Sequence, residues 1–301
     1  MKARLQGGKI GGLTLDMGDS LTNFEDSLKD MGDHTLRLHT EGDKDSFGIS
    51  MDDENFRVDG NVWEGSEVKY KDLTIGRRIG RGACSTVNIA ENESTGIPYA
   101  IKMFNVMDRE KKSQMLEEVK FLHRLNNECD SIVGMKGLFY IESNVGIVLE
   151  YMDRGSLEFL SNPKIELDHD QLAAITVQIL WGLAYLHHPH VSRIHRDIKP
   201  ANVLINSQGE VKLSDFGISK FLELDSTFSA KGSFRYMSPE RLNGKEYNFS
   251  SDVWSVGILI IQLWTKVYPF YYCSNSPVGK PLILLFSSLL FSSILLQLLQ
   301  R

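Results

Sequence analysis

The most constraining feature of the sequence is an eight-residue run from His195 to Asn202 (HRDIKPAN), followed thirteen residues after Asn202 by the triplet DFG that begins at Asp215. Asp197 can orient an attacking hydroxyl and accept its proton. Lys199 can neutralise negative charge on a phosphoryl group in transfer. Asn202 and Asp215 offer hard oxygen ligands, which favour Mg²⁺ over zinc. These residues predict a site for phosphoryl transfer.

A glycine-rich turn and a lysine further upstream fit the same chemistry. Gly80 and Gly82 lie between two predicted strands, where backbone N–H groups can approach phosphate oxygens without obstruction from a Cβ atom. Lys102 lies on the next predicted strand and can reach the α- and β-phosphates if an acidic side chain fixes its amine. Glu118 on the following helix can supply that carboxylate, and Glu117 is the alternative. The sequence therefore predicts ATP and Mg²⁺ as cofactors.

Charge and cysteine content exclude several other classes. The chain has 33 Lys and Arg against 39 Asp and Glu, a net charge of −6, so we expect no nucleic-acid partner. Cys84, Cys129 and Cys273 lack the CxxC spacing of a structural zinc site, and their odd number indicates a reducing compartment. The first residues lack the apolar segment of a signal peptide. We therefore expect a cytoplasmic protein.

Hydrophobic patterning predicts an α+β fold, with a small β-rich lobe followed by a helical lobe. Residues 1–60 are rich in Gly, Asp and Ser, which predicts a mostly disordered arm with one short strand near Phe56–Val58. The predicted strands cover Leu73–Ile79, Val87–Ala90, Tyr99–Phe104, Ile132–Tyr140 and Val145–Tyr151. The predicted helices cover Arg109–Leu125, Leu172–His187 and Val253–Trp264.

Four further motifs indicate a family. They are Leu149–Leu157 (LEYMDRGSL), Ser214–Ser219 (SDFGIS), Tyr236–Leu242 (YMSPERL) and Ser251–Ser255 (SDVWS). With them, the chain resembles eukaryotic protein kinases from about Asp72 to Phe270, and more closely the dual-specificity MAP kinase kinases. The resemblance implies a bilobal protein kinase fold. It divides the chain into an acidic arm (1–68), an N-lobe with the hinge (69–152), a partial C-lobe (153–270) and an apolar tail (271–301).

The resemblance also assigns catalytic roles. Lys102 and Glu118 should form the activating ion pair. Asp197 should be the catalytic base, with Lys199 beside it. Asn202 and Asp215 should bind the metal. Each of these residues stands at the matching motif position.

Further roles concern the nucleotide and the scaffold. Glu150 and Met152 should offer hinge backbone groups to adenine, next to Leu149 as gatekeeper. The residues implied to hold ATP are Ile79, Gly80, Gly82, Val87, Ala100, Lys102, Leu149, Glu150, Met152, Ser156, Asn202, Leu204 and Asp215. Leu122, His195 and Phe216 should stack in a column that links the lobes, and Asp252 should hold the catalytic loop. Ser85 stands where the family has the third glycine of its phosphate loop.

The family also implies regulation and partners. Ser229 falls on a family activation site, and Ser226 and Thr227 are alternative phosphate acceptors for an upstream MAP kinase kinase kinase. Near the N-terminus, a basic and leucine-containing segment resembles a docking peptide for a MAP kinase. Its residues are Lys2, Arg4, Lys9, Leu13 and Leu15.

The C-terminal tail departs from the family pattern. Residues 282–299 form a run of 18 uncharged, mostly apolar residues, which is borderline for a membrane span. Translation past a splice boundary or a truncated gene model is the favoured interpretation; a substitute packed helix and a membrane anchor remain open. Without the usual last helices, we expect one face of the helix Val253–Trp264 to lose its cover.

Taken together, these features predict a kinase that phosphorylates Thr and Tyr in the activation loop of a MAP kinase. Lys199 by itself is typical of Ser/Thr transfer, so a related Ser/Thr kinase is an alternative. A truncated, inactive protein that docks on a MAP kinase is another.

Overall fold

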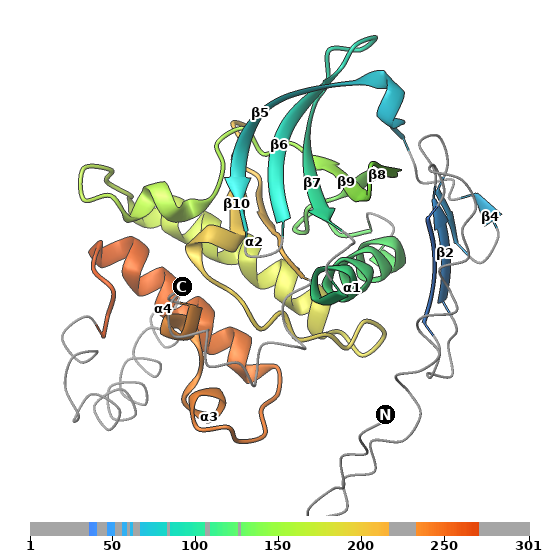
Figure 1. The fold of residues 1–301 in the computed structure, drawn as a ribbon. Coiled ribbons are helices and arrows are strands. Elements are labelled where there is room, and N and C mark those ends of the chain that lie inside the picture. Colours follow the sequence, from blue (N-terminus) through green and yellow to red (C-terminus); the bar gives the residue numbers. More distant parts are fainter. Residues whose placement is uncertain are drawn as a thin grey trace, which may run out of the picture.

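The computed structural model describes residues 36–40, 47–51, 56–58, 61–62, 67–82, 85–105, 109–125, 128–216 and 233–270 (Figure 1). The predicted docking residues, the activation-loop residues Ser226, Thr227 and Ser229, and the tail segment 282–299 lie outside the described residues. Within the part of the chain that is described, no helix combines the length and apolarity that a membrane crossing requires.

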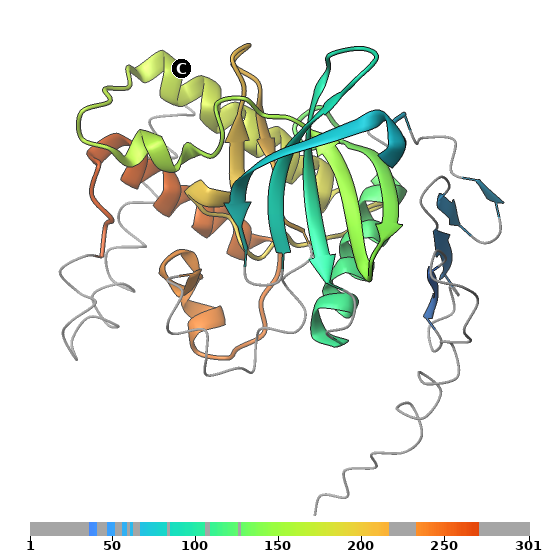
Figure 2. The same ribbon diagram turned by 45° about the horizontal axis from the view of Figure 1, so that its top comes forward.

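A five-stranded antiparallel sheet forms the upper half of the molecule in Figure 1, with strand order β5-β6-β7-β9-β8. Its strands are β5 (Leu73–Arg81), β6 (Ser85–Asn92), β7 (Pro98–Asn105), β8 (Met135–Ile141) and β9 (Asn144–Glu150). Helix α1 (Arg109–Leu125) packs against β7 (Figure 2), and its buried face includes Met115, Val119 and Leu122, at the spacing that predicted this helix.

The second half is mainly helical. Its elements are η2 (Leu157–Ser161), α2 (His169–His187), η3 (Pro200–Asn202), β10 (Val203–Ile205), β11 (Val211–Leu213), η5 (Ser233–Tyr236), α3 (Pro239–Leu242) and α4 (Ser250–Thr265). β10 and β11 pair as a two-stranded antiparallel sheet. Both long helices were predicted, and both begin three residues earlier than predicted. At α2 the reason is Asp168, whose side chain caps the helix by accepting from Gln171 N at 2.7 Å.

The two long helices lie side by side and run in opposite directions. His187 at the C-terminal end of α2 reaches Asp252 in the first turn of α4, with 2.8 Å between Nε2 and Oδ2. His169 at the start of α2 contacts Trp264 near the end of α4, with ring centroids 4.6 Å apart. This arrangement brings the SDVWS motif under the catalytic loop.

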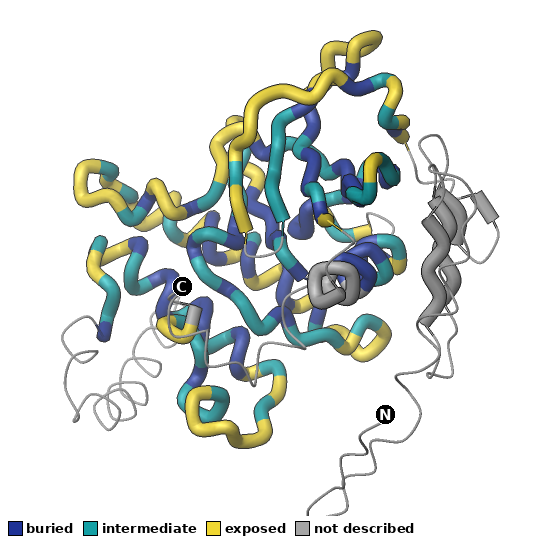
Figure 3. The backbone as a smooth tube through the Cα atoms, viewed as in Figure 1, coloured by how far each residue is buried: buried dark blue, intermediate teal, exposed yellow. Residues whose placement is uncertain are grey.

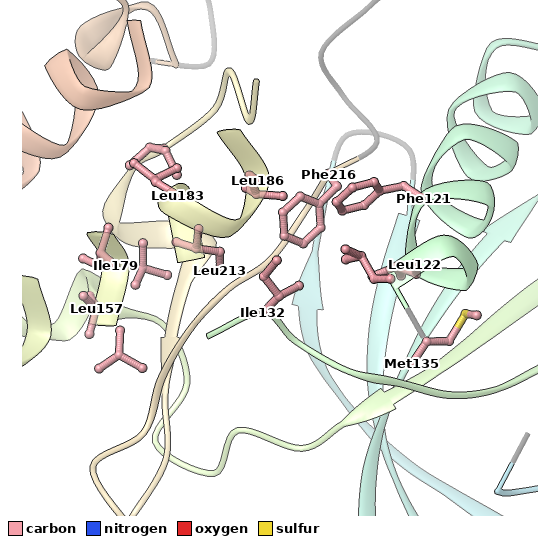
Figure 4. Packing of buried hydrophobic residues seen from close by; sticks show 14 of the residues in the cluster. Phe121, Leu122, Ile132, Met135, Leu157, Ile179, Leu183, Leu186, Leu213 and Phe216 are labelled. Carbon is pink, nitrogen blue, oxygen red and sulfur yellow. The ribbon is translucent and has the colours of Figure 1, made fainter. Parts of the chain in front are cut away.

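One apolar core joins the sheet half to the helical half. Figure 3 shows buried backbone concentrated where the sheet, α1, α2 and α4 meet. The core includes Leu122 from α1, Ile179 from α2 and Leu213 from β11 (Figure 4), together with Val119 from α1 and Leu259 from α4, and all five are nearly inaccessible. The predicted α+β class is therefore confirmed.

Four short strands precede the kinase-like part: β1 (Leu36–Thr40), β2 (Phe47–Met51), β3 (Phe56–Val58) and β4 (Asn61–Val62). Only β3 was predicted. The four pair antiparallel in the order β1-β2-β3-β4, and β2 and β3 lie against β8. Leu36 and Leu38 alternate with polar residues and stand in register with Met51 and Ile49. This period-two alternation is short, and acidic residues separate the strands. The composition of residues 1–60 therefore indicated disorder instead of strands.

Helix α4 is better covered than expected. Of its residues, only Ser250, Trp264 and Thr265 are exposed. The buried residues of this helix include Ile258 and Leu259. The expectation that this helix loses the cover of one face is therefore wrong, because α2, η2 and η5 pack around it.

Candidate active site

The predicted phosphate-loop and lysine positions form one row across the sheet. Gly80 on β5 stands opposite Val87 on β6, and Val87 stands opposite Lys102 on β7. Gly82 N donates to Ser85 O at 2.8 Å and closes the turn between β5 and β6. The pleat thus places Lys102 on the same row as the glycine turn.

Lys102 is a buried cation between two carboxylates. Its Nζ lies 2.7 Å from Oε1 and 2.8 Å from Oε2 of Glu118, and it also pairs with Asp215. Burial would lower the pKa of Lys102, but the charges of Asp215 and Glu118 raise it well above its ordinary value. The predicted ion pair with Glu118 is therefore present, and the lysine is charged.

The pKa values of the two carboxyl groups in this cluster shift in opposite directions. Burial raises the pKa of Glu118, which Lys102 offsets only in part because Asp215 adds a second negative charge. Although burial acts in the opposite direction, the Lys102 ammonium lowers the pKa of Asp215. The sequence left open whether Glu117 or Glu118 faces the lysine. Packing of α1 selects Glu118, which is 3% exposed.

The hinge segment between the two halves contains the implied adenine contacts. Leu149 stands opposite Ala100 in the β7–β9 pair. Glu150 is already engaged, since its N–H donates to Gly134 O at 3.0 Å and its carboxylate accepts from Gly134 N and Lys212. Met152 is 4% exposed, and its carbonyl accepts from Gly155 N. No hydrogen bond found among the described residues uses the Met152 N–H, which leaves a buried donor for a ligand.

Three residues of the HRDIKPAN run form a second polar cluster. Asp197 Oδ2 accepts from Lys199 Nζ at 2.7 Å and from Asn202 Nδ2 at 2.8 Å. Asn202 Nδ2 also donates to the carbonyl of Asp197 at 2.8 Å. These bonds fix one carboxylate oxygen of Asp197 and leave Oδ1 for a substrate hydroxyl. Ser214 N donates to Asn202 O at 2.9 Å, which ties this loop to the segment after β11 that leads into Asp215.

Asp252 holds the catalytic loop from below. It is fully buried, and its carboxylate accepts from the backbone N–H of His195 at 2.7 Å and of Arg196 at 2.8 Å. Burial would raise the pKa of Asp252, but the hydrogen bond from His187 and the two backbone donors hold it below its ordinary value. Arg196 has a φ of 71°, a left-handed conformation that these bonds stabilise.

Phe216 lies at the junction of the two halves. Its ring centroid is 4.9 Å from that of His195 and 4.8 Å from that of Phe121 (Figure 4). Leu122, expected in this column, belongs to the same core and comes from the same turn of α1. Burial lowers the pKa of His195, so its ring is neutral at pH 7 and can pack between apolar groups.

Two residues that make contacts at this junction were not predicted from the sequence. The Arg193 guanidinium lies 4.2 Å from the ring centroid of Phe121, and its Nη2 donates to Phe216 O at 2.8 Å. Arg193 stands two residues before the HRD motif and Phe121 one residue before Leu122. Neither position carries a spacing signal, because their contact joins segments more than seventy residues apart.

The donor set fits a hard divalent cation. Both hydrogen bonds of the Asn202 side chain to described residues use the amide nitrogen, which leaves the amide oxygen for a ligand. Asp215 supplies a carboxylate and adopts a φ of 64°. An amide oxygen and a carboxylate suit Mg²⁺.

Three further residues of the predicted nucleotide set are described. Ser156 pairs with Leu204 as an isolated antiparallel bridge. Ile79 on β5 is 38% exposed, one residue before Gly80. The predicted residues come from the five-stranded sheet, the hinge, the catalytic loop and the segment after β11.

The five-stranded sheet, the mainly helical second half and the two polar clusters together are typical of a protein kinase. The profile of the protein kinase domain matches residues 73–281, so the chain belongs to the protein kinase family. The match continues to residue 281, beyond Phe270, where the sequence motifs had suggested that the resemblance ends.

The relatives are consistently MAP kinase kinases. The chain is 38% identical over 208 residues to mitogen-activated protein kinase kinase 1c of Physcomitrium patens, covering 68% of this chain and 60% of that protein. It is 39% identical over 210 residues to dual specificity mitogen-activated protein kinase kinase 1 of Dictyostelium discoideum, covering 69% of this chain and 31% of that protein. The Drosophila melanogaster kinase dSOR1 is 37% identical over 204 residues, covering 67% and 51%. The chain spans about a third to three fifths of the length of these relatives.

Proposed function

We propose that the chain is the catalytic part of a MAP kinase kinase, which transfers the γ-phosphate of ATP to Thr and Tyr in the activation loop of a MAP kinase. The observation that carries this proposal is the pair of polar clusters, Lys102–Glu118–Asp215 and Asp197–Lys199–Asn202. They combine a fixed cation, a carboxylate with one free oxygen and two hard oxygen ligands. The names of the relatives support the choice of substrate.

Each residue then has a role. Lys102, fixed by Glu118, binds the α- and β-phosphates, and the glycine turn holds phosphate oxygens through its N–H groups. Asp197 accepts the proton of the attacking hydroxyl at Oδ1 while Lys199 stabilises the negative charge that develops. Asn202 and Asp215 would hold Mg²⁺, which supplies charge neutralisation at the phosphates when bound. The Met152 N–H binds adenine.

Regulation and partner choice form the finer part of the proposal. Phosphorylation among Ser226, Thr227 and Ser229 by an upstream kinase adds negative charge that orders the loop through basic partners. The docking segment, with cations at Lys2, Arg4 and Lys9 followed by Leu13 and Leu15, binds an acidic patch and an apolar groove on the MAP kinase.

The test is phosphotransfer from ATP and Mg²⁺ to a panel of catalytically dead MAP kinases, followed by phosphoamino-acid analysis. The full chain is compared with Asp197→Ala and with Asp153→Ala, an exposed acid that accepts from Ser207 N and pairs with Arg154. Transfer to Thr and Tyr that disappears in Asp197→Ala and persists in Asp153→Ala supports the proposal. Transfer to Ser and Thr alone indicates a related kinase, and binding without transfer in the unmutated chain indicates a docking protein.

A further inference from the structure

Helix α2 has an apolar face that the described residues leave open. Its exposed residues at helical spacing are Ala173, Val177, Leu180, Trp181 and Ala184, which we call the α2 face. Trp181 is 65% exposed, and Val177 and Leu180 are 44% and 40% exposed. From Leu172 to Leu186 the helix has no charged residue, and its polar side chains do not lie on this face.

A helix that is apolar all round is typical of a buried helix. Helix α4 illustrates this, since it is similarly apolar and exposes only Ser250, Trp264 and Thr265. On α2 the opposite side is covered by β11 and α4, with Gly182 so close to Leu213 that a Cβ would lie 2.8 Å from its Cδ1. We therefore expect a second element to cover the α2 face.

The chain contains a segment of matching chemistry. Residues 282–299 are uncharged, with thirteen apolar side chains interrupted by four serines and one glutamine. They follow directly after residue 281, where the protein kinase match ends. An apolar segment of this length needs a surface to bury against.

Geometry permits the contact. The C-terminal end of α4 lies beside the first turn of α2, because the ring centroids of Trp264 and His169 are 4.6 Å apart, and Lys266 Nζ donates to Leu160 O in η2 at 2.8 Å. From Phe270, residues 271–281 can span up to about 36 Å when extended. Eighteen residues cover about 27 Å as a helix, and the α2 face is about 17 Å long at 1.5 Å per residue. Both lengths exceed the length of the α2 face.

We propose that residues 282–299 pack on the α2 face and cover Val177, Leu180 and Trp181 within the same chain. The contact is an intramolecular apolar interface, which does not depend on the proposed kinase activity. It makes the segment part of the fold of the second half of the molecule.

Photo-crosslinking in the full chain tests the contact. Trp181→p-benzoyl-phenylalanine keeps a large aromatic side chain at the centre of the face, and Val177→p-benzoyl-phenylalanine gives a second site. The matched control is the same probe at Ile97, which is 48% exposed in the turn before β7. After irradiation and digestion, mass spectrometry should join positions 181 and 177 to peptides from 282–299 of the same chain, and position 97 to none of them.

A tail variant checks the nature of the contact. Leu289→Asp combined with Leu290→Asp should reduce the crosslink yield at position 181 at least fivefold, because buried carboxylates oppose apolar packing. An unchanged yield in this variant would overturn the proposal. Crosslinks to a second copy of the chain, to lipid from added vesicles, or to no partner at all would overturn it as well.

Discussion

Removal of the Asp252 carboxylate should destabilise the protein strongly, because two backbone donors, the buried His195 N and the partly buried Arg196 N, depend on it. The side chain accepts from His195 N at 2.7 Å, from Arg196 N at 2.8 Å and from His187 Nε2 at 2.8 Å. Each buried donor left unsatisfied costs about 1–3 kcal/mol. Loss of one member of a buried charged network costs about 3–5 kcal/mol in total. We therefore expect Asp252→Ala to lower the free energy of unfolding by about 3–5 kcal/mol.

Urea denaturation of the full chain, followed by tryptophan fluorescence, measures this effect. With a slope of about 2 kcal/mol per molar urea, the midpoint should fall by about 2 M. Asp252→Asn keeps one acceptor oxygen and should lose about half as much. The control Asp153→Ala removes an exposed acid that accepts from Ser207 N, and should shift the midpoint far less. A shift in Asp252→Ala below about 0.3 M, as for an ordinary surface substitution, would refute the reasoning.

The pH dependence gives an independent check. The pKa of Asp252 lies below its ordinary value of 3.8 in the folded protein. A carboxyl group with a lowered folded pKa stabilises the fold above its unfolded pKa, and this contribution is lost as pH falls through the folded pKa. The stability difference between the unmutated chain and Asp252→Asn should therefore be complete at pH 6 and shrink below pH 3.8. A difference that is constant across this range would contradict the assignment.

Three further substitutions test separate parts of the structure. Lys102→Met should reduce phosphotransfer at least about 100-fold, measured as label transferred from ATP, because it removes a preorganised phosphate donor. Gly146→Ala should lower the free energy of unfolding by about 1–3 kcal/mol in urea titrations, since the new Cβ would lie 2.1 Å from Phe139 Cζ. Asp168→Ala removes the cap of α2 and should cost about 1 kcal/mol by the same titration.

Each of these has a matched control. Lys136→Met on β8 removes a lysine whose ion pair, within the described part of the chain, is with Glu67, and should leave phosphotransfer unchanged. Phe139→Leu in the Gly146→Ala background should recover part of the lost stability by relieving the clash. Asp170→Ala lies in the same helical turn as the cap, outside the capping box, and should have a smaller effect than Asp168→Ala. The opposite order in any pair would contradict the corresponding contact.

Most of the candidate site was predictable because its chemistry depends on residue types at fixed spacing. Asp197, Lys199 and Asn202 lie within six residues, so one loop presents all three. The strand that carries Lys102 and the helix that carries Glu118 follow from simple periodicity. What spacing could not give was the contact between Arg193 and Phe121, since that contact depends on how α1 packs against the segment that leads into the catalytic loop.

The sequence by itself determined the class of chemistry, the positions of the motifs and the course of the long helices, because these depend on residue identity and local periodicity. Only the tertiary structure decided that Glu118 pairs with Lys102, that Asp252 reaches the backbone of the catalytic loop, and that the exposed apolar face falls on α2 rather than α4. The physical reason is that burial, charge pairing and cover are set by segments far apart along the chain, whose approach is fixed only when the whole core packs.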